Sequence, residues 1–136
     1  MPVRRRVYLC FIETQPKIIY LIDDSPLIVS RLRSILQGLD LIGEIRSAGS
    51  YESAVSLLAE QTPDLVLLDI NLGSRSGIDL LQYIRGHYPT VTVIMISNQS
   101  SPRHRAICRE LGAAHFIDKS TEFGQIRSVV SSFLQP

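Results

Sequence analysis

The sequence has little net charge, few cysteines and no long apolar run. Lysine and arginine nearly balance aspartate and glutamate, and the formal net charge of +1 gives no reason to expect a nucleic-acid or membrane partner. The two cysteines, Cys10 and Cys108, form neither a disulfide framework nor a metal-ligand spacing, so we interpret both as reduced thiols. The apolar runs are too short to span a bilayer.

An apolar run near the N-terminus is too short for a secretory signal. The run from Val7 to Ile12 follows three arginines, but no small-residue cleavage site comes after it. We therefore expect a cytoplasmic protein. Residues 1–16 as a whole do not fit the pattern of the rest. We interpret them as an N-terminal extension, which is a tail, an extra edge strand or a contact with a partner.

Residues 17–136 carry the pattern of one globular domain. Hydrophobic residues make up 45% of the chain and charged residues 20%, which is ordinary for a protein with its own core. Apolar runs of strand length alternate with segments whose apolar residues recur at helical spacing. The predicted strands are 18–22, 41–45, 65–68, 91–96 and 114–117, and the predicted helices are 26–37, 50–60, 77–85, 102–111 and a last helix after 121.

Serine followed by proline marks the start of two helices. Ser25-Pro26 and Ser101-Pro102 each place an N-cap residue before a proline at the first helical position. We expect Thr121 to cap the last helix and residues 72–76 to form a polar loop. The first helix is predicted to bury Leu27, Ile28, Leu32, Ile35 and Leu36, and the last helix to bury Phe123, Ile126, Val129, Val130 and Phe133.

Alternating strands and helices predict a doubly wound α/β fold, with a parallel sheet and helices on both faces. Right-handed crossovers leave few arrangements, and we choose the flavodoxin-like order 2-1-3-4-5 for the five strands. This order puts the first and third strands side by side. Sheets of this kind bind their ligands at the carboxyl ends of the strands.

The central strand ends in an aspartate. Four apolar residues, Leu65 to Leu68, stand between Asp64 and Asp69, which is typical of a strand buried on both faces. In the predicted order, Asp69 lies at one rim of the sheet with Asp23 and Asp24, which follow the first strand. Three neighbouring carboxylates repel one another unless a cation compensates, and all-oxygen ligands with room for water suit Mg²⁺.

Two more strand ends add a hydroxyl and an ammonium to this rim. Ser97 ends the fourth strand, and Lys119 follows the fifth. Metal, hydroxyl and ammonium together favour a phosphoryl group as the ligand, because all three stabilise its oxygens. Asp69 is the expected nucleophile, since a carboxylate can form an acyl phosphate.

This pattern resembles the receiver domain of bacterial two-component response regulators. The resemblance covers residues 17–135. It rests on the order and spacing of Asp23-Asp24, Asp69, Ser97, Gly112-Ala113, Phe116 and Lys119. It implies that Asp69 is the phosphoacceptor and a Mg²⁺ ligand, and that Lys119 pairs with the phosphoryl group.

The same resemblance implies the remaining roles. Asp24 matches the direct Mg²⁺ ligand, and Asp23 matches the ligand that acts through water. The backbone carbonyl of Asn71 matches a further Mg²⁺ ligand. Ser97 and Phe116 match a switch pair, in which the hydroxyl moves to the phosphoryl group and the ring turns inward.

The function implied is that of a stand-alone receiver, phosphorylated by a histidine kinase or a phosphotransfer protein. The face built from the fourth helix, fifth strand and fifth helix would then change its preference for a downstream protein. We expect the chain to catalyse only its own phosphorylation and dephosphorylation. A phosphohydrolase that works through an aspartyl-phosphate intermediate would need an acid/base aspartate two residues after the nucleophile, and that position is Asn71.

Two residues depart from the family pattern. Asn98 follows Ser97, where the family usually has a small residue, and Ser120 follows Lys119, where many members have proline. We therefore assume no cis peptide bond at 119–120. The departures and the unusual N-terminus keep alternatives open. One is a phosphorylation-independent adapter or dimerisation module that forms a homodimer, and another is the receiver part of a truncated DNA-binding regulator.

Overall fold

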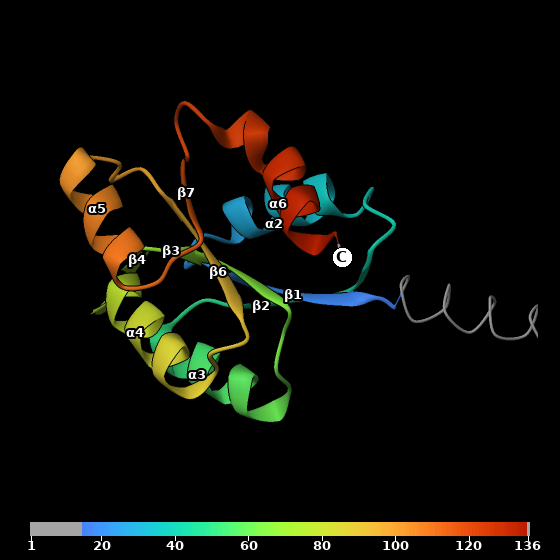
Figure 1. The fold of residues 1–136 in the computed structure, drawn as a ribbon, viewed down its shortest axis with the longest axis horizontal. Coiled ribbons are helices and arrows are strands. Elements are labelled where there is room, and N and C mark those ends of the chain that lie inside the picture. The colour runs from blue at the N-terminus through green and yellow to red at the C-terminus, as the bar shows by residue number, and fades with distance from the viewer. Residues whose placement is uncertain (1–14, 136) are drawn as a thin grey trace, which may run out of the picture.

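The structure, a computed structural model, describes residues 15–135. Its elements in chain order (Figure 1) are β1 (Lys17–Ile22), α2 (Pro26–Leu36), β2 (Ile42–Ala48), α3 (Tyr51–Glu60), β3 (Leu65–Asp69), β4 (Asn71–Leu72), β5 (Arg75–Ser76), α4 (Gly77–His87), β6 (Thr92–Ser97), α5 (Pro102–Glu110), β7 (His115–Asp118), the 3₁₀ turn η1 (Phe123–Gln125) and α6 (Ile126–Leu134). Cys10 and all of the predicted extension except Gln15 and Pro16 lie outside the described residues. Within 15–135, no helix combines the length and the apolar character that crossing a bilayer requires.

Five parallel strands form the central sheet. Their order is β2-β1-β3-β6-β7. Counted along the chain without the small hairpin β4–β5, this is the predicted order 2-1-3-4-5, so the flavodoxin-like fold is confirmed. β3 lies in the middle, between β1 and β6, and all five of its residues are buried. The four apolar residues before Asp69 therefore form a strand that is covered on both faces.

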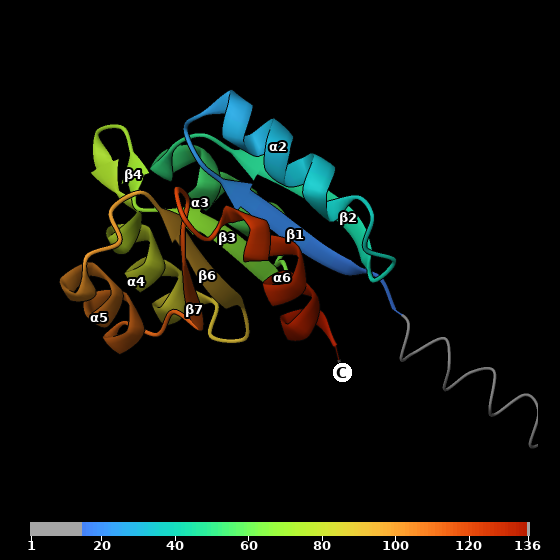
Figure 2. The ribbon, with the colours of Figure 1, turned by 90° about the horizontal axis from the view of Figure 1, so that it is seen from above.

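Helices cover both faces of the sheet. α2 and α6 lie on one side, and α3, α4 and α5 lie on the other (Figures 1 and 2). Successive side chains of each strand point to opposite faces. Ile19 and Leu21 of β1 accordingly pack in the core with α2 and α6, and Tyr20 and Ile22 pack in the other core. Two apolar cores thus hold the strands and fix where their carboxyl ends lie.

Serine hydroxyls cap the helices at both predicted positions. Ser25 Oγ accepts a hydrogen bond from the backbone nitrogen of Ile28 at 3.4 Å, and Ser101 Oγ accepts one from His104 at 3.2 Å. Such caps satisfy backbone donors that the first helical turn leaves free. They fix the start of α2 and α5 at the proline that follows each serine.

Three expectations about helix faces and caps are wrong. Leu27 is 70% exposed, because it lies about 180° around the helix from the buried Leu36. Phe133 is 38% exposed, because its ring lies beside His115 of the edge strand β7, where the sheet ends. Thr121 does not cap a helix, since the turn η1 precedes α6 and neither has a side-chain cap.

The residues predicted as a loop after the central strand form a small hairpin. β4 and β5 pair antiparallel, and Gly73 between them has φ +71°, a left-handed conformation that glycine adopts without strain. Gly77, the first residue of α4, lies directly against the end of β3. A Cβ on Gly77 would stand 1.9 Å from the carbonyl oxygen of Asp69. Glycine at this position allows α4 to start beside Asp69.

Candidate functional site

The carboxyl ends of four strands bring the predicted site residues to one edge of the sheet. Asp23 follows β1, Asp69 ends β3, Ser97 ends β6 and Lys119 follows β7. The strands are parallel and adjacent, so their ends meet at the same rim. The arrangement is the one that the sequence predicted.

Three carboxylates gather at this rim. One oxygen each of Asp23, Asp24 and Asp69 lies within 4.8 Å of the other two. Asp23 and Asp69 are buried, whereas Asp24 is exposed. The backbone nitrogen of Ser25 donates to Asp23 Oδ1 at 2.9 Å, which orients that carboxylate next to the start of α2.

Lys119 is the cation of the cluster. Its Nζ lies 2.6 Å from Asp23 Oδ2 and 3.2 Å from Asp69 Oδ2, and its side chain is only 9% exposed. Burial acts to lower the pKa of the ammonium, but its bonds and charge interactions with Asp23 and Asp69 raise the pKa above the ordinary value. Lys119 therefore stays protonated between the two carboxylates.

The groups around Asp69 do not fully compensate for the burial of its charged carboxylate, so its pKa is raised. Burial raises the pKa of its carboxyl group, and the negative charge of Asp23 raises it further. Lys119 opposes both effects, as does a backbone hydrogen bond at Asn71, but the net pKa remains above the ordinary value. A carboxylate in this position is a stronger base than one in water, which suits a nucleophile.

Ser97 and Phe116 lie inside the protein. Ser97 is fully buried, and its Oγ accepts a hydrogen bond from the backbone nitrogen of Gln99 at 3.0 Å. This bond leaves the hydroxyl proton free to donate elsewhere. The Phe116 ring is 8% exposed within the core, and the Arg105 guanidinium stands 4.9 Å from its centre.

The two departures from the family pattern lie on the loops beside the site. Asn98 is an exposed residue directly after Ser97. Ser120 donates hydrogen bonds to Asp118 from its backbone nitrogen and its hydroxyl. Every peptide bond in the described part of the chain is trans, including the one at 119–120.

Two features beside the site were not predicted from the sequence: the role of Asp118 and the side-chain contact between Asn71 and Gln99. Gln99 Nε2 donates to Asn71 Oδ1 at 3.4 Å, which links the loop after β6 to the first residue of β4. Asp118 is buried and hydrogen-bonded to the residues after Lys119. Its signal in the sequence was an aspartate at a strand end two residues before Ser120, because aspartate side chains in turns often accept a hydrogen bond from the backbone nitrogen two residues on.

The donor set fits a divalent cation. The three candidate ligands of the cluster offer carboxylate oxygens, which Mg²⁺ prefers, and the exposed side of Asp24 leaves room for water. The ammonium of Lys119 balances one of the three negative charges. Two negative charges remain, and one Mg²⁺ ion would balance them.

A model of the response regulator receiver domain matches residues 19–131. The chain belongs to this family. Receiver domains bind Mg²⁺ at an acidic pocket and interact with histidine kinases or phosphotransfer proteins. The described part of this chain has a cluster of three aspartates at the rim of its sheet.

Curated relatives agree with the family assignment. The transcriptional regulatory protein MctR of Rhizobium johnstonii is 31% identical over 119 residues, which cover 87% of this chain and 56% of MctR. The response regulator protein PilR of Pseudomonas aeruginosa is 34% identical over 115 residues, which cover 85% of this chain and 25% of PilR. This receiver chain therefore spans only a quarter to about half of the length of these relatives.

Solved structures agree with the fold. The receiver domain of NtrX from Brucella abortus has a TM-score of 0.76 and 30% identity, covering 85% of this chain and 97% of the other. A LuxR-family response regulator from Aurantimonas sp. SI85-9A1 has a TM-score of 0.81 at 22% identity, covering 88% of this chain and 86% of the other. At that identity the second likeness concerns the fold alone.

Proposed function

We propose that this receiver accepts a phosphoryl group on Asp69 and transmits the signal by protein contact. The donor is a histidine kinase or a phosphotransfer protein. The observation that carries the proposal is the surroundings of Asp69. Its buried carboxylate lies 3.2 Å from the Lys119 ammonium and belongs to an acidic cluster with Asp23 and Asp24.

The transfer makes one bond and breaks one. A carboxylate oxygen of Asp69 bonds to phosphorus while the bond from phosphorus to the donor breaks, and the electron pair of that bond leaves with the donor. Lys119 faces Asp69 and stabilises the negative charge on the phosphoryl oxygens. Ser97, whose hydroxyl proton is free, donates a hydrogen bond to one of them.

The acidic cluster supplies the metal ligands of this proposal. Asp24 and Asp69 would hold Mg²⁺ directly, Asp23 would act through water, and the backbone carbonyl of Asn71 would complete the protein ligands. Bound Mg²⁺ neutralises charge on the phosphoryl group. Lys119 holds Asp23 and Asp69 together when the metal is absent, since its ammonium bonds to both.

The output follows from the added charge. Phosphorylation adds roughly −1.5 to −2 charges beside Ser97 and Lys119. A conformer that turns both groups toward the phosphoryl oxygens is then favoured. A shift from 1:99 to 99:1 needs about 5.5 kcal/mol of preference. Phe116 is the second member of the switch pair, and the face of α5, β7 and α6 changes its affinity for a downstream protein.

The proposed extent of the receiver domain is residues 17–136, with residues 1–16 as an extension, in a cytoplasmic protein. The relatives favour a second candidate. This chain matches only part of proteins such as the transcriptional regulatory protein MctR, so the second candidate is the receiver part of a longer DNA-binding regulator. The mass of the native protein in the source cells decides between them. The mass of the 136-residue chain supports the stand-alone receiver, and a larger mass supports the second candidate.

The test of phosphoryl acceptance is the intact mass after incubation with Mg²⁺ and acetyl phosphate. The wild type should gain one phosphoryl group, and Asp69→Asn should gain none. No gain in a folded wild type that binds Mg²⁺ and is also offered histidine kinases would overturn the proposal. That result would favour a phosphorylation-independent adapter. Analytical ultracentrifugation would detect the homodimer that such an adapter forms.

A further inference from the structure

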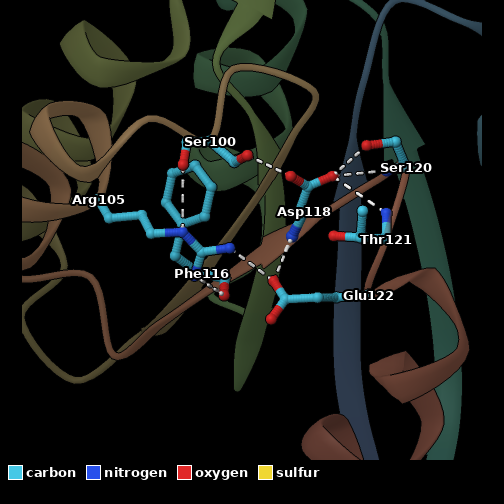
Figure 3. Close-up of polar contacts among 7 residues, drawn as sticks. All are labelled: Ser100, Arg105, Phe116, Asp118, Ser120, Thr121 and Glu122. Atoms are coloured by element: carbon cyan, nitrogen blue, oxygen red, sulfur yellow. Dashed lines mark hydrogen bonds and ion pairs between the residues drawn. The ribbon is translucent and has the colours of Figure 1, made fainter.

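A second buried carboxylate lies next to the site without belonging to the acidic cluster. Asp118 ends β7, directly before Lys119, and is 7% exposed. Its Oδ1 accepts hydrogen bonds from Ser120 N at 2.7 Å, Ser120 Oγ at 2.6 Å and Thr121 N at 3.2 Å. These bonds close the turn that follows Lys119 (Figure 3).

The other oxygen of Asp118 reaches a different loop. Ser100 Oγ donates a hydrogen bond to Asp118 Oδ2 (Figure 3). Ser100 lies in the loop between β6 and α5, three residues after Ser97. One carboxylate therefore joins the loop that follows Ser97 to the turn that follows Lys119. A side chain that only closed its own turn would not need the bond from Ser100.

The backbone supports the same connection. Ser97 and Asp118 are partners in the register of β6 and β7, and Lys119 N donates to Ser97 O at 3.0 Å. Both strands end at this point. The Ser100–Asp118 hydrogen bond adds a side-chain contact between the loop after β6 and the last residue of β7.

An outer ion pair holds α5 to the same turn. Glu122 Oε1 accepts from Asp118 N at 2.9 Å and from Arg105 Nη2 at 2.7 Å. Arg105 also donates to the carbonyl oxygens of Ser100 and Phe116, both at 3.4 Å (Figure 3). The loop that carries Ser100 is thus fixed from α5 as well as from Asp118.

The donors around Asp118 keep it charged. Hydrogen bonds from Ser100 and Ser120 lower the pKa of its carboxyl group far below the ordinary value. Charge-assisted hydrogen bonds are stronger than neutral ones, so an ionised Asp118 holds both loops more firmly than a neutral side chain would.

We propose that Asp118 is a positioning residue for phosphoryl acceptance. Its carboxylate fixes the loop after Ser97 against the turn after Lys119, so that the hydroxyl and the ammonium meet the same phosphoryl group together. The inference rests on the proposed function of Asp69. In this proposal Asp118 contacts neither the phosphoryl donor nor the phosphoryl group. It acts through the positions of Ser97 and Lys119.

The test compares two neighbouring serines in the purified 136-residue protein. Ser100→Ala removes only the bond between the loops. Ser101→Ala makes the same chemical change one residue further, removing the cap of α5 without touching Asp118. The quantities measured are the rate of Asp69 labelling against acetyl phosphate concentration, and amide hydrogen exchange.

We expect Ser100→Ala to lower the maximal labelling rate about tenfold, since small misplacements of reacting groups have effects of that order or more. The acetyl phosphate concentration at half-maximal rate should stay unchanged. Exchange should become faster at 98–101 and at the amide of Lys119. Ser101→Ala should lower thermal stability but keep the labelling rate and the Lys119 exchange of the wild type.

The remaining outcomes would each overturn a different claim: the positioning role of Asp118, the connection between the loops or the proposed function. Labelling of Ser100→Ala at the wild-type maximal rate, or an equal loss in Ser101→Ala, overturns the positioning role. Unchanged exchange in Ser100→Ala overturns the connection between the loops. A wild type that gains no phosphoryl group overturns the proposed function instead, and the exchange comparison still decides whether Asp118 ties the loops. Ser100→Ala is preferred to Asp118→Asn because it removes a single bond.

Discussion

Asp69 and Asp118 are the same residue type at the carboxyl ends of two strands in one sheet, and both are buried. Their surroundings differ. Asp118 accepts hydrogen bonds from three neighbouring residues, which lower its pKa. Asp69 faces one ammonium and further negative charge, and its pKa is raised. A carboxylate surrounded by donors has no free oxygen with which to react, whereas one with few donors remains available to a metal or a phosphoryl group.

The largest expected effect is the loss of labelling in Asp69→Asn. An amide cannot form the acyl phosphate, so the mass after incubation with acetyl phosphate and Mg²⁺ should not change. Asp118→Asn should still gain a phosphoryl group, at a lower rate, because it leaves the nucleophile intact. Labelling that survives in Asp69→Asn, or disappears in a folded Asp118→Asn, would reverse the roles of the two aspartates.

Removing the cation beside Asp69 should have the next largest effect. Lys119→Gln should slow labelling about 100-fold, the size of the loss when one stabilising donor is removed. The same change should strengthen Mg²⁺ binding several-fold, because the ammonium no longer competes for Asp23. Titration calorimetry measures the binding, and weaker Mg²⁺ binding in the variant would show that Lys119 supports the metal site.

The backbone beneath Asp69 offers a third test. Gly77→Ala should lower the free energy of unfolding by about 2–3 kcal/mol, because its Cβ would overlap the Asp69 carbonyl. Gly86, in the same helix, has open space where a Cβ would be. Gly86→Ala should therefore raise the free energy of unfolding by about 0.5–1 kcal/mol. Urea unfolding measures both, and equal effects would refute the close contact.

The smallest effect is a difference in pH dependence without Mg²⁺. Because folding raises the pKa of Asp69 from its ordinary 3.8, its contribution to stability is present at low pH and lost as pH rises through the raised pKa. Folding lowers the pKa of Asp118, so its contribution is present above 3.8 and lost as pH falls. The measurement is the urea midpoint of unfolding across acidic and neutral pH. Asp69→Asn should lose the fall in stability with rising pH, and Asp118→Asn should lose the fall in stability with falling pH.

Much of the fold could be predicted because its signals are local. The apolar run before Asp69 and the serine caps at Ser25 and Ser101 each depend on a few neighbouring residues. Leu27 was placed wrongly because it was assigned to the face of Leu36, from which it lies about 180° around the helix. Phe133 was placed wrongly because helical spacing does not tell where a helix passes the edge of the sheet. The hairpin β4–β5 was missed because its strands have only two residues each.

The candidate site was predictable in its residues but not in its contacts. A strand end and a parallel sheet are enough to bring Asp23, Asp69 and Lys119 to one rim. They do not reveal that the Lys119 ammonium bonds to Asp23, 96 residues away, more closely than to Asp69. They also do not reveal that Ser100 reaches Asp118, since that contact depends on the path of two loops.

The sequence by itself determined which polar groups stand at the strand ends, because the periodicity of apolar residues sets the length of each strand and the order of the elements. It thereby determined the family and the three aspartates that meet at the rim of the sheet. Only the tertiary structure decided which aspartate lacks donors and which is saturated with them. Burial and hydrogen bonding depend on loops and helices that are distant in the chain, and these set the pKa and the availability of each carboxylate.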